Sequence, residues 1–415
     1  MLLSEHPSSS AAPRFFLYSH DGMGLGHTRR HIAIARALSE LEPSASVLLV
    51  TGTEEVTRLG IPAQVEILKL PGLRKVENGS YVSRRMSISA EEIRTFRASL
   101  LRTAVRSFKP NVVLVDKHPF GASGEFREAL RIAKDQGARS VLGLRDILDS
   151  PETVAAEWTP YRTQRAIAKN YDQVFVYGHA HVFDSVREYR FPDVLASRTR
   201  FCGYVVNPAA TPSGRGGEKR VVPLATTQQP LVIASAGGGE DGAFLIESFV
   251  RSAVDVPWKG MAVAGPMMPE SRFRLLERIA LRNRVIFRRF VPDLPNYLQI
   301  ASAVVCMGGY NTLGEALAAG VPTVCVPRVE PREEQLIRAQ AFGRLGLMTW
   351  LHPRELTPAR LGAAISLAVN QSRQSIRSRV SRVLNFQGAQ AAALQLHAQA
   401  RESLIPGRLP LCSNP

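Results

Sequence analysis

The sequence is poor in cysteine and contains no long apolar run. Its four cysteines, Cys202, Cys306, Cys325 and Cys412, form no Cys-x-x-Cys pair and have no closely spaced histidine partners. This excludes a zinc finger and a disulfide framework and favours a reducing cytoplasm. No stretch approaches the roughly 18 consecutive apolar residues that span a bilayer, and residues 1–13, expected to be flexible, lack the apolar segment of a signal peptide. Any membrane contact is therefore expected to be peripheral, on the inner face of the membrane.

Two common catalytic signatures are also missing. The sequence has no Gly-x-Ser-x-Gly elbow, which argues against covalent catalysis by a serine. It has no Asp-x-Asp pair either, and Asp146 and Asp149 have the wrong spacing to bridge a metal ion in that way. Neither a metal nor an organic cofactor is expected.

What the sequence has in excess is arginine. The 52 Lys and Arg residues, 44 of them Arg, outnumber the 36 Asp and Glu residues and give a formal net charge of +16. Such a charge favours an anionic partner, although GC-rich codon usage explains an arginine excess equally well. No nucleic-acid-binding motif is present, so nucleic acid is not an expected partner. An anionic membrane surface stays open.

Four arginines near the C-terminus recur at helical spacing beside apolar residues: Arg373, Arg377, Arg379 and Arg382. Such a helix suits a membrane surface, and on this interpretation the chain is a non-catalytic, basic surface-binding protein. A helix that packs back across a domain interface would show the same pattern.

Short β-branched runs alternate with longer amphipathic ones, which predicts an α/β fold with parallel strands. Strands are expected at 14–19, 46–51, 112–116, 140–144 and 173–177, and again at 230–236, 260–264, 284–288, 303–306 and 323–326. Residues 207–229 are rich in proline and glycine and read as a linker. We therefore expect Rossmann-like domains at 14–206 and 230–385, a C-terminal helix at 386–404 and a flexible tail at 405–415.

Three glycines, Gly22, Gly24 and Gly26, lie between the first strand and a helix expected over 28–41. Such a turn lets backbone N–H groups approach a phosphate, and it also serves simply to pack a helix on its sheet. His27 ends this turn, where open α/β sheets bind ligands, and imidazole is suited to general-base catalysis. Arg29, Arg30 and His31 would make the same mouth cationic.

An acidic residue, Glu54 or Glu55, also lies where a dinucleotide-binding fold holds its ribose, so this first turn by itself leaves a dehydrogenase open. Charged residues follow two further strands. Asp116, Lys117 and His118 follow one, and Arg145 and Asp146 follow another. Asp116 and Asp146 are candidate catalytic bases or acceptor clamps, and either could instead only cap the next helix.

The most specific motif spans residues 307–322, Met-Gly-Gly-Tyr-Asn-Thr-Leu-Gly-Glu-Ala-Leu-Ala-Ala-Gly-Val-Pro, and is followed by Glu333-Glu334-Gln335. This stretch resembles the donor-sugar signature of glycosyltransferases with the GT-B fold, in which two Rossmann-like domains face each other across a cleft. It is similar to the bacterial N-acetylglucosaminyltransferases of peptidoglycan lipid-intermediate synthesis, and closer to predicted bacterial glycosyltransferases that carry Gly-Gly-Tyr-Asn-Thr. The resemblance covers both halves and argues against a dehydrogenase.

The resemblance implies a role for each matching residue. Gly308 and Gly309 would receive the donor diphosphate at a helix N-terminus together with Asn311 and Thr312, and Glu315 would bind the ribose hydroxyls. Glu334, or Glu333 in its place, and Gln335 would contact the donor hexose. Phe290 and Val291 would meet the base, and Gly237, Gly238 and Gly239 would form a second phosphate loop. That loop continues with Glu240 and Asp241, which would repel a diphosphate unless they point away.

The implied reaction is inverting, metal-independent transfer of a sugar from a nucleoside-diphosphate donor, UDP-linked, to an acceptor hydroxyl. His27 would be the base and the first domain would hold the acceptor, which could be a glycan, a lipid-linked compound or a small molecule. Arg328, Arg332 and Arg338 would help to stabilise the leaving group. A nucleotide-sugar 2-epimerase or hydrolase on the same scaffold is the alternative enzyme.

Overall fold

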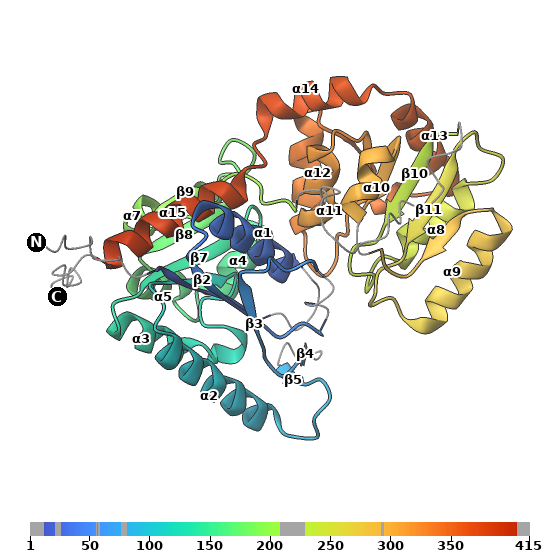
Figure 1. Ribbon diagram of the computed structural model, residues 1–415. Coiled ribbons are helices and arrows are strands. Elements are labelled where there is room, and N and C mark those ends of the chain that lie inside the picture. The colour runs from blue at the N-terminus through green and yellow to red at the C-terminus, as the bar shows by residue number, and fades with distance from the viewer. Residues whose placement is uncertain are drawn as a thin grey trace, which may run out of the picture.

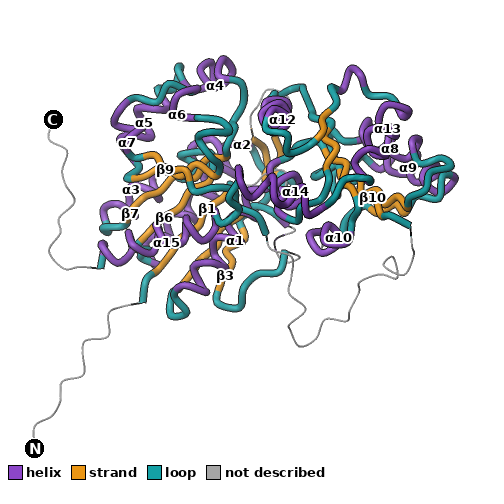
Figure 2. Tube along the Cα trace, turned by 90° about the horizontal axis from the view of Figure 1, so that it is seen from above, coloured by secondary structure: helices purple, strands orange, loops and turns teal. Residues whose placement is uncertain are grey.

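The computed structural model describes residues 12–20, 26–54, 56, 59–75, 81–207, 229–291 and 294–404. They form two α/β domains that stand side by side (Figures 1 and 2). Gly22, Gly24, the tail 405–415 and most of the expected linker 207–229 lie outside the described residues.

The N-terminal domain is built on a seven-stranded parallel sheet in the order β3-β2-β1-β6-β7-β8-β9. Alternate residues of β1 enter opposite cores: Phe15 and Leu17 pack with helix α1, whereas Phe16 and Tyr18 pack with α2 and α3. Because both faces are covered, the strand is apolar throughout, and this pattern made it predictable. The strands are β1 (Arg14–Ser19), β2 (Ser46–Thr51), β3 (Val65–Lys69), β6 (Val112–Asp116), β7 (Arg139–Arg145), β8 (Gln173–Tyr177) and β9 (Thr199–Phe201).

Helices cover both faces of this sheet, and a short antiparallel hairpin lies outside it. Helix α2 begins with a capping box, in which the Ser89 hydroxyl accepts from the Glu92 N–H and the Glu92 carboxylate accepts from the Ser89 N–H. The helices are α1 (Gly26–Leu41), α2 (Ala90–Phe108), α3 (Arg127–Asp135), α4 (Pro151–Trp158), α5 (Thr163–Asn170), α6 (Ser185–Glu188) and α7 (Asp193–Ser197), and the hairpin is β4 (Leu73–Lys75) and β5 (Tyr81–Ser83).

The C-terminal domain repeats the plan with a six-stranded parallel sheet in the order β12-β11-β10-β13-β14-β15. Its strands are β10 (Leu231–Ser235), β11 (Lys259–Val263), β12 (Ile286–Arg288), β13 (Ala303–Cys306), β14 (Thr323–Cys325) and β15 (Thr349–Trp350). Its helices are α8 (Ala243–Ser252), α9 (Glu270–Arg282), α10 (Leu294–Ile300), α11 (Tyr310–Ala318), α12 (Glu334–Arg344), α13 (Pro358–Val369) and α14 (Arg373–Val383).

The strand order reverses once in each sheet, between β1 and β6 in the first and between β10 and β13 in the second. The chain leaves the carboxyl ends of these neighbouring strands in opposite directions, which opens a crevice where α/β folds bind ligands. Gly26, which begins α1, and the glycines 237–239, which follow β10, lie at these two positions.

The last helix, α15 (Gly388–Ser403), crosses back to the N-terminal domain and packs against α1, β6 and β7 (Figure 1). Its buried residues join a core cluster that continues through Tyr204, Tyr310 and Phe342 into the C-terminal domain. The helix therefore ties the end of the second domain to the first.

The arginines of α14 fix carbonyl groups at the ends of neighbouring helices. Arg373 donates to the carbonyls of Leu298, Gln299 and Ala319, and Arg379 donates to the Gly346 carbonyl at 2.6 Å. These contacts account for Arg373 and Arg379 by packing, whereas Arg382 is exposed and donates to the Ser378 hydroxyl of its own helix. Within the described residues, no helix combines the length and the apolar character that a bilayer crossing requires.

Candidate active site

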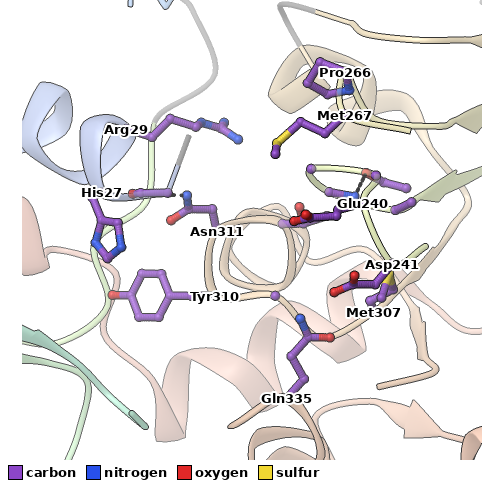
Figure 3. A pocket seen from close by; sticks show the side chains of 18 of the residues that line it. His27, Arg29, Glu240, Asp241, Pro266, Met267, Met307, Tyr310, Asn311 and Gln335 are labelled. Atoms are coloured by element: carbon purple, nitrogen blue, oxygen red, sulfur yellow. Dashed lines mark hydrogen bonds between the residues drawn. The ribbon is translucent and has the colours of Figure 1, made fainter. Parts of the chain in front are cut away.

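A cleft of about 470 Å³ opens where the crevices of the two domains face each other (Figure 3). Figure 3 shows His27 and Arg29 on one side, Glu240 and Asp241 on the other, and the start of α11 between them. Among the described residues, four of those predicted as catalytic, donor-binding or acceptor-side residues do not line it: Asp116, Asp146, Gly308 and Glu315. Those that do are Gly26, His27, Arg29, Lys117, His118, Arg145, Gly237, Gly238, Gly239, Phe290, Val291, Gly309, Asn311, Thr312, Glu334 and Gln335.

His27 lies in the first turn of α1 and is held by two groups beneath the cleft. Its Nδ1 lies 3.0 Å from Asp116 Oδ1, at the carboxyl end of β6, and 2.7 Å from Arg30 Nη2. The imidazole keeps 14% of its side-chain surface exposed, whereas the Asp116 carboxyl has none. The imidazole therefore faces the cleft with Asp116 behind it. Asp116 cannot itself meet a substrate, which corrects its assignment as a base or acceptor clamp.

Asp116 is ionised because the Arg30 guanidinium forms an ion pair with it. Arg30 Nη2 donates to both carboxylate oxygens at 3.0 and 2.9 Å, and its Nε adds a third contact. Burial would raise the pKa of Asp116, but Arg30 and His27 reverse this and hold it well below its ordinary range. Arg30 and His31 are themselves buried, at 1% and 0% exposure. Arg30 still lines the cleft, with its guanidinium bound to Asp116, whereas His31 does not line it and so does not form part of the cationic mouth expected from the sequence.

Asp146 has a different partner, in the other domain. Arg338 of α12 binds it with both ends of a fork, Nε to Oδ2 at 2.8 Å and Nη2 to Oδ1 at 2.7 Å. The third nitrogen of Arg338, Nη1, donates to the Gly308 carbonyl at 2.9 Å. Both side chains are almost completely buried. The structure therefore does not support Asp146 as a base, nor Arg338 as a group that meets the substrate.

Glu315 lies on α11 with 1% of its side chain exposed, and its Oε1 is 2.5 Å from Arg29 Nη2 of the first domain. Burial raises the pKa of Glu315, and Arg29 and Asn207 oppose that shift. The residue expected to bind the ribose is thus paired with an arginine expected on the acceptor side. A ribose could reach Glu315 only by taking the place of Arg29.

The glycine loops of the C-terminal domain bring their backbone close to neighbouring elements and to the cleft. Gly308 has φ of 79°, and a Cβ there would lie 2.9 Å from Cys325 Sγ. Gly309 precedes α11 with open space in front of it, so the first N–H groups of that helix face the cleft. Gly239 has φ of 91° and approaches Ala264 so closely that a Cβ would lie 2.4 Å from its carbonyl oxygen.

Arg328 neutralises part of the acidic loop that was expected to repel a diphosphate. Its Nη1 pairs with Asp241 Oδ2 and its Nη2 with Glu334 Oε1, each at 2.7 Å, and its backbone N–H donates to the Gln335 side chain. Asp241 is therefore neutralised beside the phosphate loop, while Glu240 is exposed. One arginine also fixes both residues expected to contact the donor hexose.

The N-terminal domain lines its side of the cleft with cations and imidazoles. Lys117 and Arg145 lie at the ends of β6 and β7, and His20, which sequence reasoning missed, stacks edge-on with His118 at 4.5 Å between ring centroids. The position of His20 directly after β1 could have identified it, because ligands bind at the carboxyl ends of such strands. Tyr310 was also missed, although it lies within the C-terminal motif; its hydroxyl accepts from the Val205 N–H. Among the described residues, no group of three His, Cys, Asp or Glu side chains is placed to hold a metal ion.

Known proteins resemble this chain in both sequence and fold. Residues 271–394 match the model of the glycosyltransferase family 28 C-terminal domain. NDP-glycosyltransferase YjiC of Bacillus subtilis is 27% identical over 64% of this chain, a match that spans 65% of the Bacillus protein. The UDP-N-acetylglucosamine–N-acetylmuramyl-(pentapeptide) pyrophosphoryl-undecaprenol N-acetylglucosamine transferase of Corynebacterium efficiens is 25% identical, over 71% of this chain and 76% of its own length.

Among solved structures, a UDP-glucosyltransferase from Polygonum tinctorium superposes with a TM-score of 0.65 at 15% identity, covering 95% of this chain and all of the other. MurG of Acinetobacter baumannii gives a TM-score of 0.55 at 16% identity, over 94% of this chain and all of the other. The two facing Rossmann-like domains are therefore those of the GT-B fold, as predicted.

The family match falls on the second domain, which carries α11 and its two glycines. With the named relatives, it identifies the chain as a glycosyltransferase, and its C-terminal domain as similar to that of family 28.

Proposed function

We propose that the protein transfers a sugar from a UDP-linked donor to an acceptor hydroxyl, with inversion at the anomeric carbon and without a metal ion. The observation that carries this proposal is the His27–Asp116 pair, which faces the glycine turn and helix start of the opposite domain across one cleft. UDP is favoured as the carrier because two of the relatives are named for UDP-linked sugars.

His27 would act as the general base through Nε2. With its proton on Nδ1 and shared with Asp116, the ring presents the lone pair of Nε2 to the acceptor hydroxyl. The acceptor oxygen attacks the anomeric carbon as the bond to the diphosphate breaks, and the hydroxyl proton passes to His27. Asp116 stabilises the imidazolium that forms. Arg30 also lies against Nδ1, and because a guanidinium can only donate, a hydrogen bond from Arg30 would require Nδ1 to be without its proton. The reactive tautomer therefore persists only while the Arg30 guanidinium donates to Asp116.

The second domain would hold the donor. The N-terminal amides of α11 behind Gly309 receive the diphosphate charge, as helix N-termini do for phosphates. Arg328 adds a cation beside it and positions Glu334 and Gln335 for the hexose. Phe290 and Val291 would contact the base. Charge on the leaving UDP is then stabilised by fixed dipoles and an arginine.

The acceptor would lie over α1 and the ends of β6 and β7. A relative of similar sequence acts, by its name, on an undecaprenol-linked compound, and a lipid-linked acceptor is one of the classes we propose. The protein would then work in the cytoplasm, at the inner face of the membrane. A soluble glycan or small molecule is the other class.

The proposal is tested by UDP release and nucleotide binding in the presence of a chelator. We expect UDP to raise the melting temperature of the wild type, and Glu315→Ala to abolish that shift. His27→Ala should lower kcat by about 10²–10⁴-fold with UDP binding retained. His181→Ala is the matched control, because His181 is exposed and does not line the cleft.

Three results would contradict parts of this proposal. Absence of any thermal response to nucleoside diphosphates would remove the donor site, and turnover of His27→Ala within threefold of wild type would remove the base. Donor turnover that needs no acceptor would mean hydrolysis or epimerisation in place of transfer.

A further inference from the structure

Two cations at the acceptor side of the cleft have no carboxylate partner in the part of the chain that the structure describes. Lys117 follows β6 and Arg145 ends β7, and these strands are neighbours, with the Lys117 N–H donating to the Gly143 carbonyl at 2.7 Å. Both side chains line the cleft. Within the described residues, neither forms an ion pair, and the Arg145 Nε is buried without an acceptor.

Arg145 is partly exposed, with its Nε buried, and it differs from the three described arginines that are buried completely. Arg30, Arg97 and Arg338 each grip one carboxylate at two or more points, on Asp116, Glu125 and Asp146. Burying a polar atom of a cation, such as the Arg145 Nε, without an acceptor is costly, and proteins rarely keep such an atom unless something else binds it. The described residues thus pair three buried arginines with carboxylates and leave Arg145 for another partner.

The surroundings of Lys117 and Arg145 add to the excess of positive charge. Burial, together with Arg145 and Arg332, lowers the pKa of Lys117 to about 7, although Glu334 and Glu157 oppose this shift. Burial and the cations Arg338 and Arg30 lower the pKa of Arg145, against Glu334 and Asp146. The carboxylates that oppose these shifts are held elsewhere: Glu334 by Arg328, Glu157 by Arg332 and Asp146 by Arg338.

The backbone at Lys117 is strained as well. Its φ is 65°, in the left-handed region that a side chain with a Cβ seldom adopts, and such strain is retained mainly where function requires it. This conformation places Lys117 directly after Asp116, the partner of His27. One strand end therefore supports the proposed base and presents a cation beside it.

We infer that Lys117 and Arg145 form an anion subsite that receives a phosphate or carboxylate group of the acceptor, next to the hydroxyl that is glycosylated. This rests on the proposed function. Both residues belong to the first domain and flank the His27–Asp116 pair, whereas the donor loops have their own cation in Arg328. The acceptor is accordingly an anionic alcohol.

The first test measures anion binding with the donor site filled. Inorganic phosphate and benzoate are titrated calorimetrically into enzyme saturated with UDP. We expect Lys117→Met and Arg145→Met each to weaken binding of the preferred anion at least tenfold, with UDP binding unchanged. Binding at pH 8 should take up close to one proton in the wild type and none in Lys117→Met.

Matched controls remove the same charges elsewhere. Lys109→Met removes a lysine that also has left-handed φ, at the end of α2, and Arg139→Met removes the arginine at the other end of β7; neither residue lines the cleft. Both controls should bind anions as the wild type does. If Lys117→Met and Arg145→Met also bind anions normally, the subsite does not exist.

The second test uses acceptors that share one hydroxyl: benzyl alcohol, 4-(hydroxymethyl)benzoate and 4-(hydroxymethyl)phenyl phosphate. We expect kcat/KM for one anionic member to exceed that for benzyl alcohol at least tenfold, and the preference to disappear in Lys117→Met. The better anion distinguishes carboxylate from phosphate. Equal kcat/KM for all three would overturn the inference.

Two further outcomes separate this inference from others. If UDP-glucuronate binds tenfold more tightly than UDP-glucose and Lys117→Met removes the difference, the cations serve the donor sugar and the acceptor assignment is wrong. If UDP itself does not bind, the proposed function fails, whatever the anions do.

Discussion

The substitution Asp146→Asn distinguishes a structural role of Asp146 from a catalytic one. Asp146 neutralises Arg338 across the domain interface through contacts of 2.7 and 2.8 Å, and both side chains are at most 2% exposed. Removing one partner of such a pair leaves a buried charge uncompensated and costs about 3–5 kcal/mol. For a domain of this size, that lowers the melting temperature by roughly 6–20 °C.

The assay is calorimetric unfolding of Asp146→Asn together with its kcat for UDP release. We expect the loss of stability above and a kcat within threefold of wild type, because Asp146 does not line the cleft. Glu157→Gln is the control: Glu157 pairs with Arg332 with 48% of its side chain exposed, and such a pair contributes about 1 kcal/mol or less.

A double substitution tests the cause of the loss. Asp146→Leu with Arg338→Met removes both charges and should recover stability to within about 1–2 kcal/mol of wild type, since an apolar pair replaces a buried ion pair at little cost. The remaining deficit is the hydrogen bond from Arg338 to the Gly308 carbonyl. A wild-type melting temperature combined with a hundredfold lower kcat in Asp146→Asn would refute this reasoning and return Asp146 to catalysis.

Three further predictions follow from other contacts. Burial lowers the pKa of His31 from 6.5 to about 4, so between these pH values the folded state binds fewer protons than the unfolded state. The free energy of unfolding should therefore fall by roughly 3 kcal/mol as the pH drops from 6.5 to 4. Unfolding measured over this pH range should show a smaller fall for His31→Leu. Arg29→Met should tighten UDP binding about fivefold, because Arg29 no longer occupies Glu315; weaker binding in calorimetry would show that Arg29 contacts the nucleotide. Arg373→Met should cost about 1–2 kcal/mol in urea unfolding through its lost carbonyl contacts, and an unchanged midpoint would contradict this.

The strands of both sheet centres could be predicted from sequence because they are buried on both faces. β6 is apolar up to Asp116 and fully buried, so its pattern has no competing interpretation. β3 was missed: its sequence Val-Glu-Ile-Leu-Lys places charged residues on an edge strand that is only partly covered. β15 consists of two residues and gives too short a pattern to recognise.

The site could be predicted only where local sequence decides geometry. A glycine turn followed by a helix places His27 and Gly309 at the two crevices, and the structure has both there. The ion-pair partners of the site carboxylates could not be predicted in this way. Asp116 and Asp146 both follow an apolar strand, yet one binds Arg30 of its own domain and the other binds Arg338, 192 positions away. No local pattern distinguishes these outcomes, because domain packing decides them.

The same packing decides which of the 52 basic residues can act on a ligand. Arg30, Arg97 and Arg338 pair with buried carboxylates, and Arg373 donates to helix carbonyls. Each of these arginines therefore stabilises the fold and adds little to the electrostatic potential in the cleft. The potential that an incoming anion meets depends instead on the cations left without such partners. Removal of Lys117 or Arg145 should therefore weaken anion binding more than removal of several exposed arginines, although the net charge changes less.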